Sequence, residues 1–390
     1  MSLKINFDHT LSLQREILEK LISFDTTSEK SNIDLVNYIC DFLYGHQIDT
    51  TKIYNSDGSK ASIFYTIGAE NKKGLIFSAH TDTVPVDISQ WSTDPYTLNI
   101  RDNKYIGRGT TDMKGFISIL LSLTPWLISN NLSYPFHVAL SYDEEVGCLG
   151  VQPLIESIKD KIKEPKLVIV GEPTKLQIID RHKSCHTYQT EFFGLKAHSC
   201  DPSWGCNAIY FASVFIEKLK ELELLLIEQN RDDNYDPPYS TINIGVIQGG
   251  KAHNIVPDYV KIIWQIRCLP DIDHTILLKD LFENIIPAIE SDMKVKSEKA
   301  YIINRNTSNI LPLVRSSYPN KIDKLRSKTN TPSGVSYGTD AGYFSNQGWQ
   351  TIVCGPGDIE QAHKSNEYIL IEDIKLGMHF VENMVNDYLI

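Results

Sequence analysis

Residues 75–82 read Leu-Ile-Phe-Ser-Ala-His-Thr-Asp, a short apolar run that passes directly into the polar residues His80 and Asp82. Such a run, bounded by turn residues, is typical of a buried β-strand. The same kind of run recurs at residues 138–140, 167–170 and 351–354. Helical patterns such as residues 115–123 lie between these runs, so the sequence predicts an α/β domain with a mostly parallel central sheet.

The chain length of 390 residues exceeds the size at which one hydrophobic core usually stops growing, which predicts two domains. After about Lys183 the pattern changes to strands at 186–193, 239–248 and 259–267, helices at 207–228 and 274–289, and one more strand near 293–303. The order βαββα suits an antiparallel sheet covered on one side by two helices, the ferredoxin-like arrangement. We expect residues 183–294 to form this inserted α+β domain, and residues 1–182 and 295–390 to form the α/β domain.

The composition argues against several classes of protein. Hydrophobic residues make up 42% of the chain, and no apolar run approaches the roughly 20 residues of a membrane span. A formal net charge of -11 argues against nucleic acid or an anionic membrane as a partner. The seven cysteines show no CxxC spacing and no signal-peptide pattern precedes them, so we expect reduced thiols in a cytoplasmic protein.

Polar residues of the types that bind metals follow each predicted strand of the α/β domain, where open α/β sheets place their ligands. A lone histidine such as His80 is more often structural, but Asp82 could orient its imidazole from behind. Asp112 lies in the glycine-rich stretch 107–115, where it could bridge two cations or simply cap a helix. That stretch lacks the Lys-Ser/Thr of a phosphate loop and the dinucleotide fingerprint, which argues against a nucleotide enzyme.

Three consecutive acids, at residues 143–145, follow the run at 138–140. A solvated turn would explain them, but zinc chemistry also would, because one glutamate can bind the metal while its neighbour takes a proton from water. Glu172 and His363 follow the last two runs and complete a set of ligand-type residues.

Five ordered motifs resemble those of the two-zinc metallohydrolase family that holds acetylornithine deacetylase, succinyl-diaminopimelate desuccinylase, carboxypeptidase G and aminoacylase. They are SAHTDTVP (78–85), GRGTTDMKG (107–115), SYDEEVG (141–147), VGEPT (170–174) and QAH (361–363). The resemblance implies one zinc held by His80, Asp112 and Glu172, and a second held by Asp112, Glu145 and His363. It also implies Glu144 as the general base and Asp82 as the partner of His80. Co²⁺ or Mn²⁺ could replace Zn²⁺, because these ligand types accept all three.

The inserted domain resembles the lid and dimerisation module of the same family, which implies a homodimer. His198 would come from the partner subunit and stabilise the oxyanion. Arg267 would bind the α-carboxylate of the substrate, Asn254 would orient it, and Thr339 would lie in a substrate-contacting loop. The alternative for His198 is a surface histidine near a turn. For Arg267 it is an ordinary surface ion pair, and for Thr339 it is a plain turn.

The motif sequences are most similar to those of the acetylornithine deacetylase branch, which implies removal of the acetyl group from N2-acetyl-L-ornithine in arginine biosynthesis. A desuccinylase, or a deacylase of another N-acyl amino acid, is the alternative within the same chemistry. A metal-free binding protein on this fold is the alternative of a different class.

Overall fold

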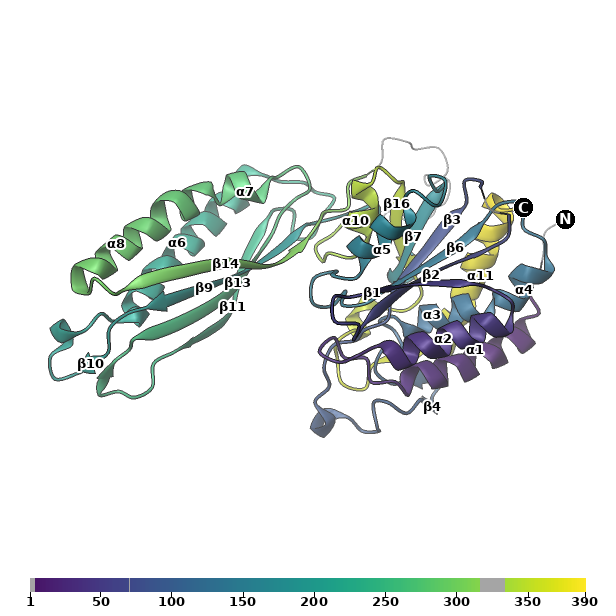
Figure 1. Cartoon of the computed structure of the whole chain (residues 1–390), viewed down its shortest axis with the longest axis horizontal. Helices are drawn as coiled ribbons and strands as arrows, with labels where there is room; N and C mark the ends of the chain where they lie inside the picture. The colour runs from purple at the N-terminus through teal and green to yellow at the C-terminus, as the bar shows by residue number, and fades with distance from the viewer. Residues whose placement is uncertain (1–3, 70, 316–333) are drawn as a thin grey trace. The chain divides into compact units, whose positions relative to one another are not determined.

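A computed structural model describes residues 4–69, 71–315 and 334–390, which form two compact units (Figure 1). The first unit comprises the described residues up to Asp180, residues 314–315 and Thr339–Ile390. The second comprises Arg181–Leu313 and residues 334–338. This boundary lies beyond the expected residue 294, because β14 (Tyr301–Ile310) pairs along its length with β9 (Cys185–Phe193) of the second unit.

The first unit contains a six-stranded sheet in the order β1-β2-β6-β3-β7-β16. The strands are β1 (Thr50–Tyr54), β2 (Ala61–Ile67), β3 (Leu75–His80), β6 (Phe136–Ser141), β7 (Leu167–Pro173) and β16 (Thr351–Gly355). The last four are mutually parallel, and the β1–β2 hairpin joins them antiparallel to β6. The predicted mostly parallel α/β sheet is therefore confirmed.

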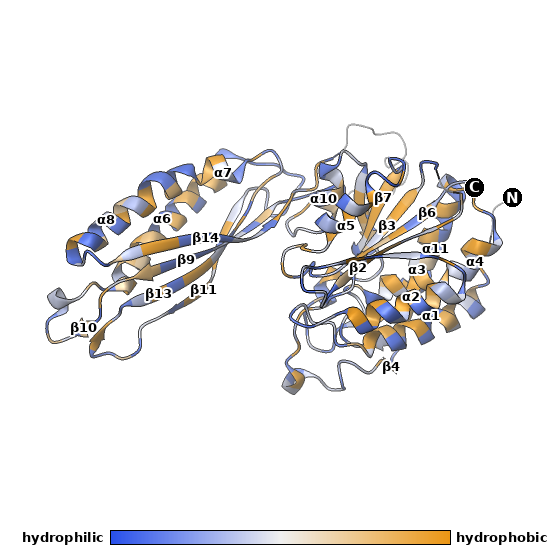
Figure 2. Ribbon diagram, in the orientation of Figure 1, coloured by the Kyte–Doolittle hydropathy of each residue, from blue (hydrophilic) through white to orange (hydrophobic). Residues whose placement is uncertain are grey.

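Helices cover both faces of this sheet (Figure 1). One face carries α1 (Phe7–Ile22), α2 (Ile33–Gly45), α3 (Lys114–Ser122), α4 (Thr124–Ser129) and α11 (Ile371–Tyr388), and the other carries α5 (Val151–Ile158) and α10 (Ala341–Asn346). Figure 2 shows that β3, β6 and β7 are apolar along most of their length, as strands buried on both faces should be. The sheet therefore forms a rigid base on which the loops at its edge are held.

A small antiparallel sheet supports two of these loops. It contains β4 (Asn99–Arg101), β5 (Lys104–Ile106) and β17 (Tyr368–Leu370) in the order β17-β5-β4. Because β17 follows the segment with His363 and β5 precedes the loop with Asp112, their pairing brings together segments far apart in the sequence.

The second unit has an antiparallel sheet in the order β11-β13-β9-β14, with β11 (Thr241–Gly249) and β13 (Tyr259–Arg267). On one face lie α6 (Ala208–Gln229), α7 (His274–Leu277) and α8 (Ile286–Lys296), the last two joined by a π-helical turn at Leu281–Ile285. This is the expected ferredoxin-like arrangement. The further strand expected near residues 293–303 is present but lies later in the chain, because α8 continues to Lys296 and β14 begins only at Tyr301.

Two further expectations concern the whole chain. All seven cysteines are free thiols, and all except Cys200 are buried. Among the described helices, none combines the length and the apolar character that crossing a membrane requires.

Candidate active site

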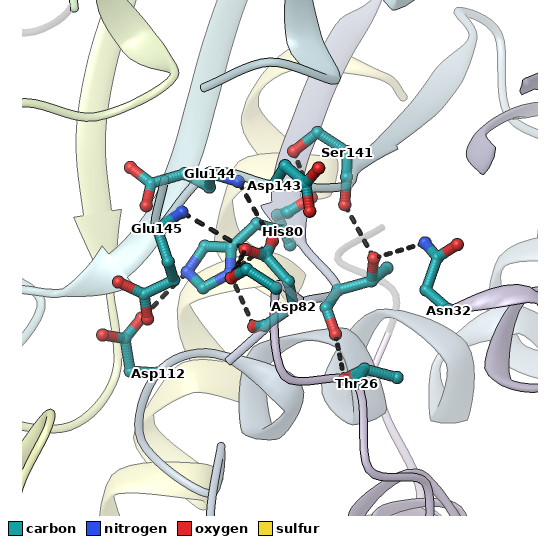
Figure 3. Close-up of polar contacts among 12 residues, drawn as sticks. Thr26, Asn32, His80, Asp82, Asp112, Ser141, Asp143, Glu144 and Glu145 are labelled. Atoms are coloured by element: carbon teal, nitrogen blue, oxygen red, sulfur yellow. Dashed lines mark hydrogen bonds and ion pairs between the residues drawn. The ribbon is translucent and has the colours of Figure 1, made fainter. Parts of the chain in front are cut away.

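The predicted ligand residues of the first unit gather where the parallel strands end. Figure 3 shows three of them, His80, Asp112 and Glu145. His80 is the last residue of β3, Glu172 lies next to the end of β7, and Glu145 follows β6. Asp112 lies in the loop before α3. Parallel strands share one carboxyl edge, so three segments distant in the sequence deliver their polar side chains to one place.

His80, Asp112 and Glu172 form a first buried group whose ligand atoms all lie within 4.8 Å of one another. The Nε2 of His80 is 2.9 Å from Oδ1 of Asp112 and 3.9 Å from Oε1 of Glu172. These separations are compatible with one cation among the three side chains, at ligand distances of roughly 2.0–2.2 Å after small adjustments.

Asp112, Glu145 and His363 form a second group within the same limit. The Nε2 of His363 lies 3.3 Å from Oδ2 of Asp112 and 3.0 Å from Oε2 of Glu145. The two oxygens of Asp112 therefore face two different histidines. One carboxylate shared in this way is suited to bridge two cations.

The backbone oxygen of Asp82 fixes the tautomer of His80. This oxygen is 3.0 Å from Nδ1 of His80, and a carbonyl can only accept, so Nδ1 carries a proton and Nε2 is the nitrogen that would offer its lone pair to a cation bound beside Asp112. The carboxylate of Asp82 is farther away, with Oδ1 at 3.5 Å from Nδ1. Its hydrogen bonds come from the backbone N–H groups of Glu144 (3.1 Å) and Glu145 (3.2 Å) (Figure 3). A third comes from the hydroxyl of Ser28 (2.7 Å). Asp82 thus holds the acidic turn as well as the imidazole.

The three consecutive acids have different surroundings. Asp143 pairs with Lys60, whose Nζ lies 2.6 Å from Oδ1. Glu145 faces His363, and Glu144 is buried behind it with the thiol of Cys148 3.7 Å from its Oε1. The segment is therefore not a solvated turn.

The charges of this cluster fit bound cations. Burial, and then the neighbouring Asp112, raises the pKa of Glu172 well above its usual range, and its Oε1 is buried with no hydrogen-bond partner among the described residues. Contacts with Asp112 and Glu145 raise the pKa of His363 to about 10. The site therefore contains several buried carboxylates around two imidazoles, and one of these carboxylates, that of Glu172, has an oxygen without a hydrogen-bond partner among the described residues. This is the donor set that a divalent cation requires.

Two buried residues near Glu144 were missed by the sequence reasoning. Asp340 accepts a hydrogen bond from the hydroxyl of Ser141 at 2.5 Å, and Asp340, Cys148 and Glu144 lie within 4.8 Å of one another. Burial raises the pKa of Asp340 to about 6. The hydroxyl of the neighbouring Thr339 accepts from the N–H of Ala341, the first residue of α10, at 3.1 Å.

The remaining predicted residues lie in the second unit. His198 is exposed in the short strand β10 (Ala197–His198), which pairs with β12 (Ile255–Val256), and its Nδ1 accepts from the N–H of Cys200 at 3.0 Å. Asn254 is also exposed. It lies near His198, because its backbone carbonyl accepts from the N–H of Ser199, the residue after His198. Arg267 is the last residue of β13, at the end of the strand away from Asn254, and it donates to the carbonyl of Ser336 at 3.0 Å.

Comparisons of the sequence with a family model and with known proteins point to the same family of hydrolases. Residues 76–387 match the model of peptidase family M20/M25/M40. The acetylornithine deacetylase of Myxococcus xanthus is 31% identical over 376 residues, covering 94% of each chain. That of Pectobacterium carotovorum is 31% identical over 394 residues, covering 99% of each chain.

Solved structures share the fold. An M20 family metallo-carboxypeptidase from Sulfolobus solfataricus superposes with a TM-score of 0.74 at 18% identity, covering 96% of this chain and 98% of the other. The YXEP protein of Bacillus subtilis, a dinuclear metal binding peptidase, gives a TM-score of 0.65 at 11% identity, covering 97% and 98%. The chain therefore belongs to peptidase family M20/M25/M40 and is a metal-dependent amide hydrolase.

Proposed function

We propose that this enzyme removes the acetyl group from N2-acetyl-L-ornithine, giving L-ornithine and acetate, with two zinc ions in its active site. The observation that supports the two-metal centre is the position of Asp112 in both ligand groups. The choice of substrate rests on the relatives named acetylornithine deacetylase, which align with nearly the whole chain.

The two groups give each ion its ligands. His80 and Glu172 would hold one zinc, Glu145 and His363 the other, and Asp112 would bridge them. Zinc ions held by these residues would lower the pKa of water toward neutrality and polarise the amide carbonyl of the substrate. Cobalt or manganese could occupy the same ligands.

Glu144 is the proposed general base. Its side chain is buried beside the ligand groups, and the described residues offer it only the weak thiol donor of Cys148 at 3.7 Å. Its carboxylate is therefore free to take a proton from the attacking water and to pass that proton to the leaving amine. Asp82 fixes the backbone from which Glu144 extends.

Four further residues are proposed to act on the substrate. The N–H of Cys200 occupies Nδ1 of His198, so a neutral His198 carries its proton on Nε2 and can donate to an oxyanion. By the family resemblance, this histidine would serve the active site of a partner subunit. Arg267 would bind the α-carboxylate, and Asn254 and Thr339 would position the acyl amino acid.

A homodimer is proposed from the second unit. Its helix α6 exposes apolar side chains, and β11 is at an end of the described sheet. The exposed residues are Ile209, Tyr210, Val214, Leu224 and Leu225. Light scattering coupled to size-exclusion chromatography should give twice the mass of one chain, and the mass of a single chain would refute the dimer.

The substrate is tested by steady-state hydrolysis of N2-acetyl-L-ornithine beside N-succinyl-diaminopimelate and N-acetyl-methionine. Each assay is run on chelated enzyme before and after zinc is restored. A zinc-dependent preference for acetylornithine supports the proposal. Zinc-dependent turnover of the succinyl compound instead would assign a desuccinylase, and no turnover by a zinc-loaded protein would favour a non-catalytic binding protein.

A further inference from the structure

We propose that Glu367, a buried residue outside both ligand groups, is a positioning residue that holds Asp112 in place for the two metal ions. This role rests on the two-metal centre of the proposed function. Glu367 lies just before β17 and is 1% exposed. Its carboxylate is surrounded by the loop at residues 107–112, whose last residue is Asp112.

The hydrogen bonds of Glu367 explain how it shapes this loop. Its Oε1 accepts from the backbone N–H groups of Thr111 (2.8 Å) and Asp112 (3.0 Å). Its Oε2 accepts from the N–H of Gly109 (2.9 Å) and from Nη1 of Arg108 (2.8 Å). Three backbone donors of one short loop thus converge on one side chain, and one of them belongs to the bridging residue itself.

The charge of Glu367 is balanced within the fold. Arg108 is 3% exposed and forms a buried ion pair with it. A buried carboxylate needs such a partner together with hydrogen bonds to its remaining lone pairs, and Glu367 has both. The ion pair with Arg108 therefore offsets part of the cost of burying this carboxylate beside the loop.

Glu367 also connects the two groups of metal ligands. It follows His363 by four positions, and its own carbonyl accepts from the N–H of Gly107 at 3.0 Å. The next residue, Tyr368, accepts from the hydroxyl of Thr111 at 2.6 Å. Hydrogen bonds therefore hold the segment that supplies His363 against the loop that supplies Asp112, and Glu367 makes most of these bonds.

The variant Glu367→Gln tests this role. A glutamine keeps the size of the side chain but has a single acceptor oxygen, so its NH₂ group would face either the two N–H groups at Oε1 or the donors at Oε2. The matched control is Glu360→Gln, which removes one negative charge from an exposed position in the same C-terminal segment. Zinc affinity is measured on the metal-free full chain by competition with a chromophoric chelator, and folding is checked by circular dichroism.

We expect E367Q to bind zinc 10- to 100-fold more weakly than the wild type, the usual effect of losing a residue behind the ligands, and E360Q to bind within about twofold. A merely structural role would lower the melting temperature of the metal-free protein and leave zinc affinity unchanged, and that result would overturn the proposal. If E367Q does not fold, E367D replaces it: aspartate keeps the charge but is one methylene shorter, so weakened zinc binding is again expected and unchanged affinity again refutes the role. A wild-type protein that binds fewer than two zinc ions would overturn the two-metal centre itself, whereas two zinc ions with an unaffected E367Q would overturn the role of Glu367 alone.

Discussion

Replacing Asp82 by Asn separates the hydrogen bonding of this residue from its shape. The carboxylate of Asp82 accepts from the N–H of Glu144 at Oδ1 and from the N–H of Glu145 and the hydroxyl of Ser28 at Oδ2. Asparagine is nearly the same size but turns one of the two acceptors into a donor. If the NH₂ replaces Oδ1 it meets the N–H of Glu144, and if it replaces Oδ2 it meets that of Glu145, whereas the hydroxyl of Ser28 can rotate to accept.

The expected cost follows from this count. One buried N–H loses its acceptor in either orientation, and the bonds that remain lose the assistance of a charge. Together these effects should lower the free energy of unfolding of the first unit by about 2–4 kcal/mol.

The assay is urea denaturation of the metal-free protein, followed by tryptophan fluorescence. Asp102→Asn is the control, because Asp102 is 78% exposed and pairs only with neighbouring Arg101 among the described ion pairs, so a change below about 0.5 kcal/mol is expected. A D82N protein as stable as this control would refute the view that Asp82 holds the acidic turn.

Three other perturbations have definite expected outcomes. Glu144→Gln should lower kcat by about 10²- to 10⁴-fold while the zinc content measured by mass spectrometry stays unchanged, and near-wild-type turnover would show that Glu144 is not the base. Chelation should lower the melting temperature, because buried carboxylates lose their countercharge, and zinc at about a thousand times its Kd should restore about 4 kcal/mol per site; a melting curve indifferent to zinc would argue against the centre. Burial lowers the pKa of His137 to about 4, whereas the same residue in the unfolded chain takes up a proton near pH 6.5. The free energy of unfolding should therefore fall as the pH drops from about 6.5 to 4, and His137 should contribute up to about 3 kcal/mol of that fall. His137→Gln should remove that part of the pH dependence in urea titrations, and an identical slope in the variant would contradict it.

The clustering of the candidate ligand residues could be predicted from the sequence because a simple rule places them at the ends of the strands. Apolar strands are recognisable in a sequence, and the residues at their carboxyl ends, such as His80 and Glu172, must meet when the strands are parallel. The sequence could not show that Asp82 bonds mainly to backbone N–H groups. Such bonds depend on the path of the main chain, which residue types do not encode one by one.

Glu367 and Asp340 were missed for a related reason. Glu367 binds backbone donors of a loop more than two hundred residues earlier, and no spacing within the sequence announces such a contact. The end of the second unit was misplaced because β14 reads Tyr-Ile-Ile-Asn-Arg-Asn-Thr-Ser-Asn-Ile, where polar residues interrupt the alternation expected of a strand. Pairing with β9 forms this strand despite its composition.

The assembly of one centre from both ends of the chain has a consequence for biosynthesis. His80, Asp112 and Glu172 all precede the second unit, whereas His363 and Glu367 follow it. At about 5–20 residues per second, an emerging chain exposes its first ligands many seconds before the second group can close. The second group can therefore form only after the whole second unit has been synthesised, and a chain truncated before His363 would lack that group altogether.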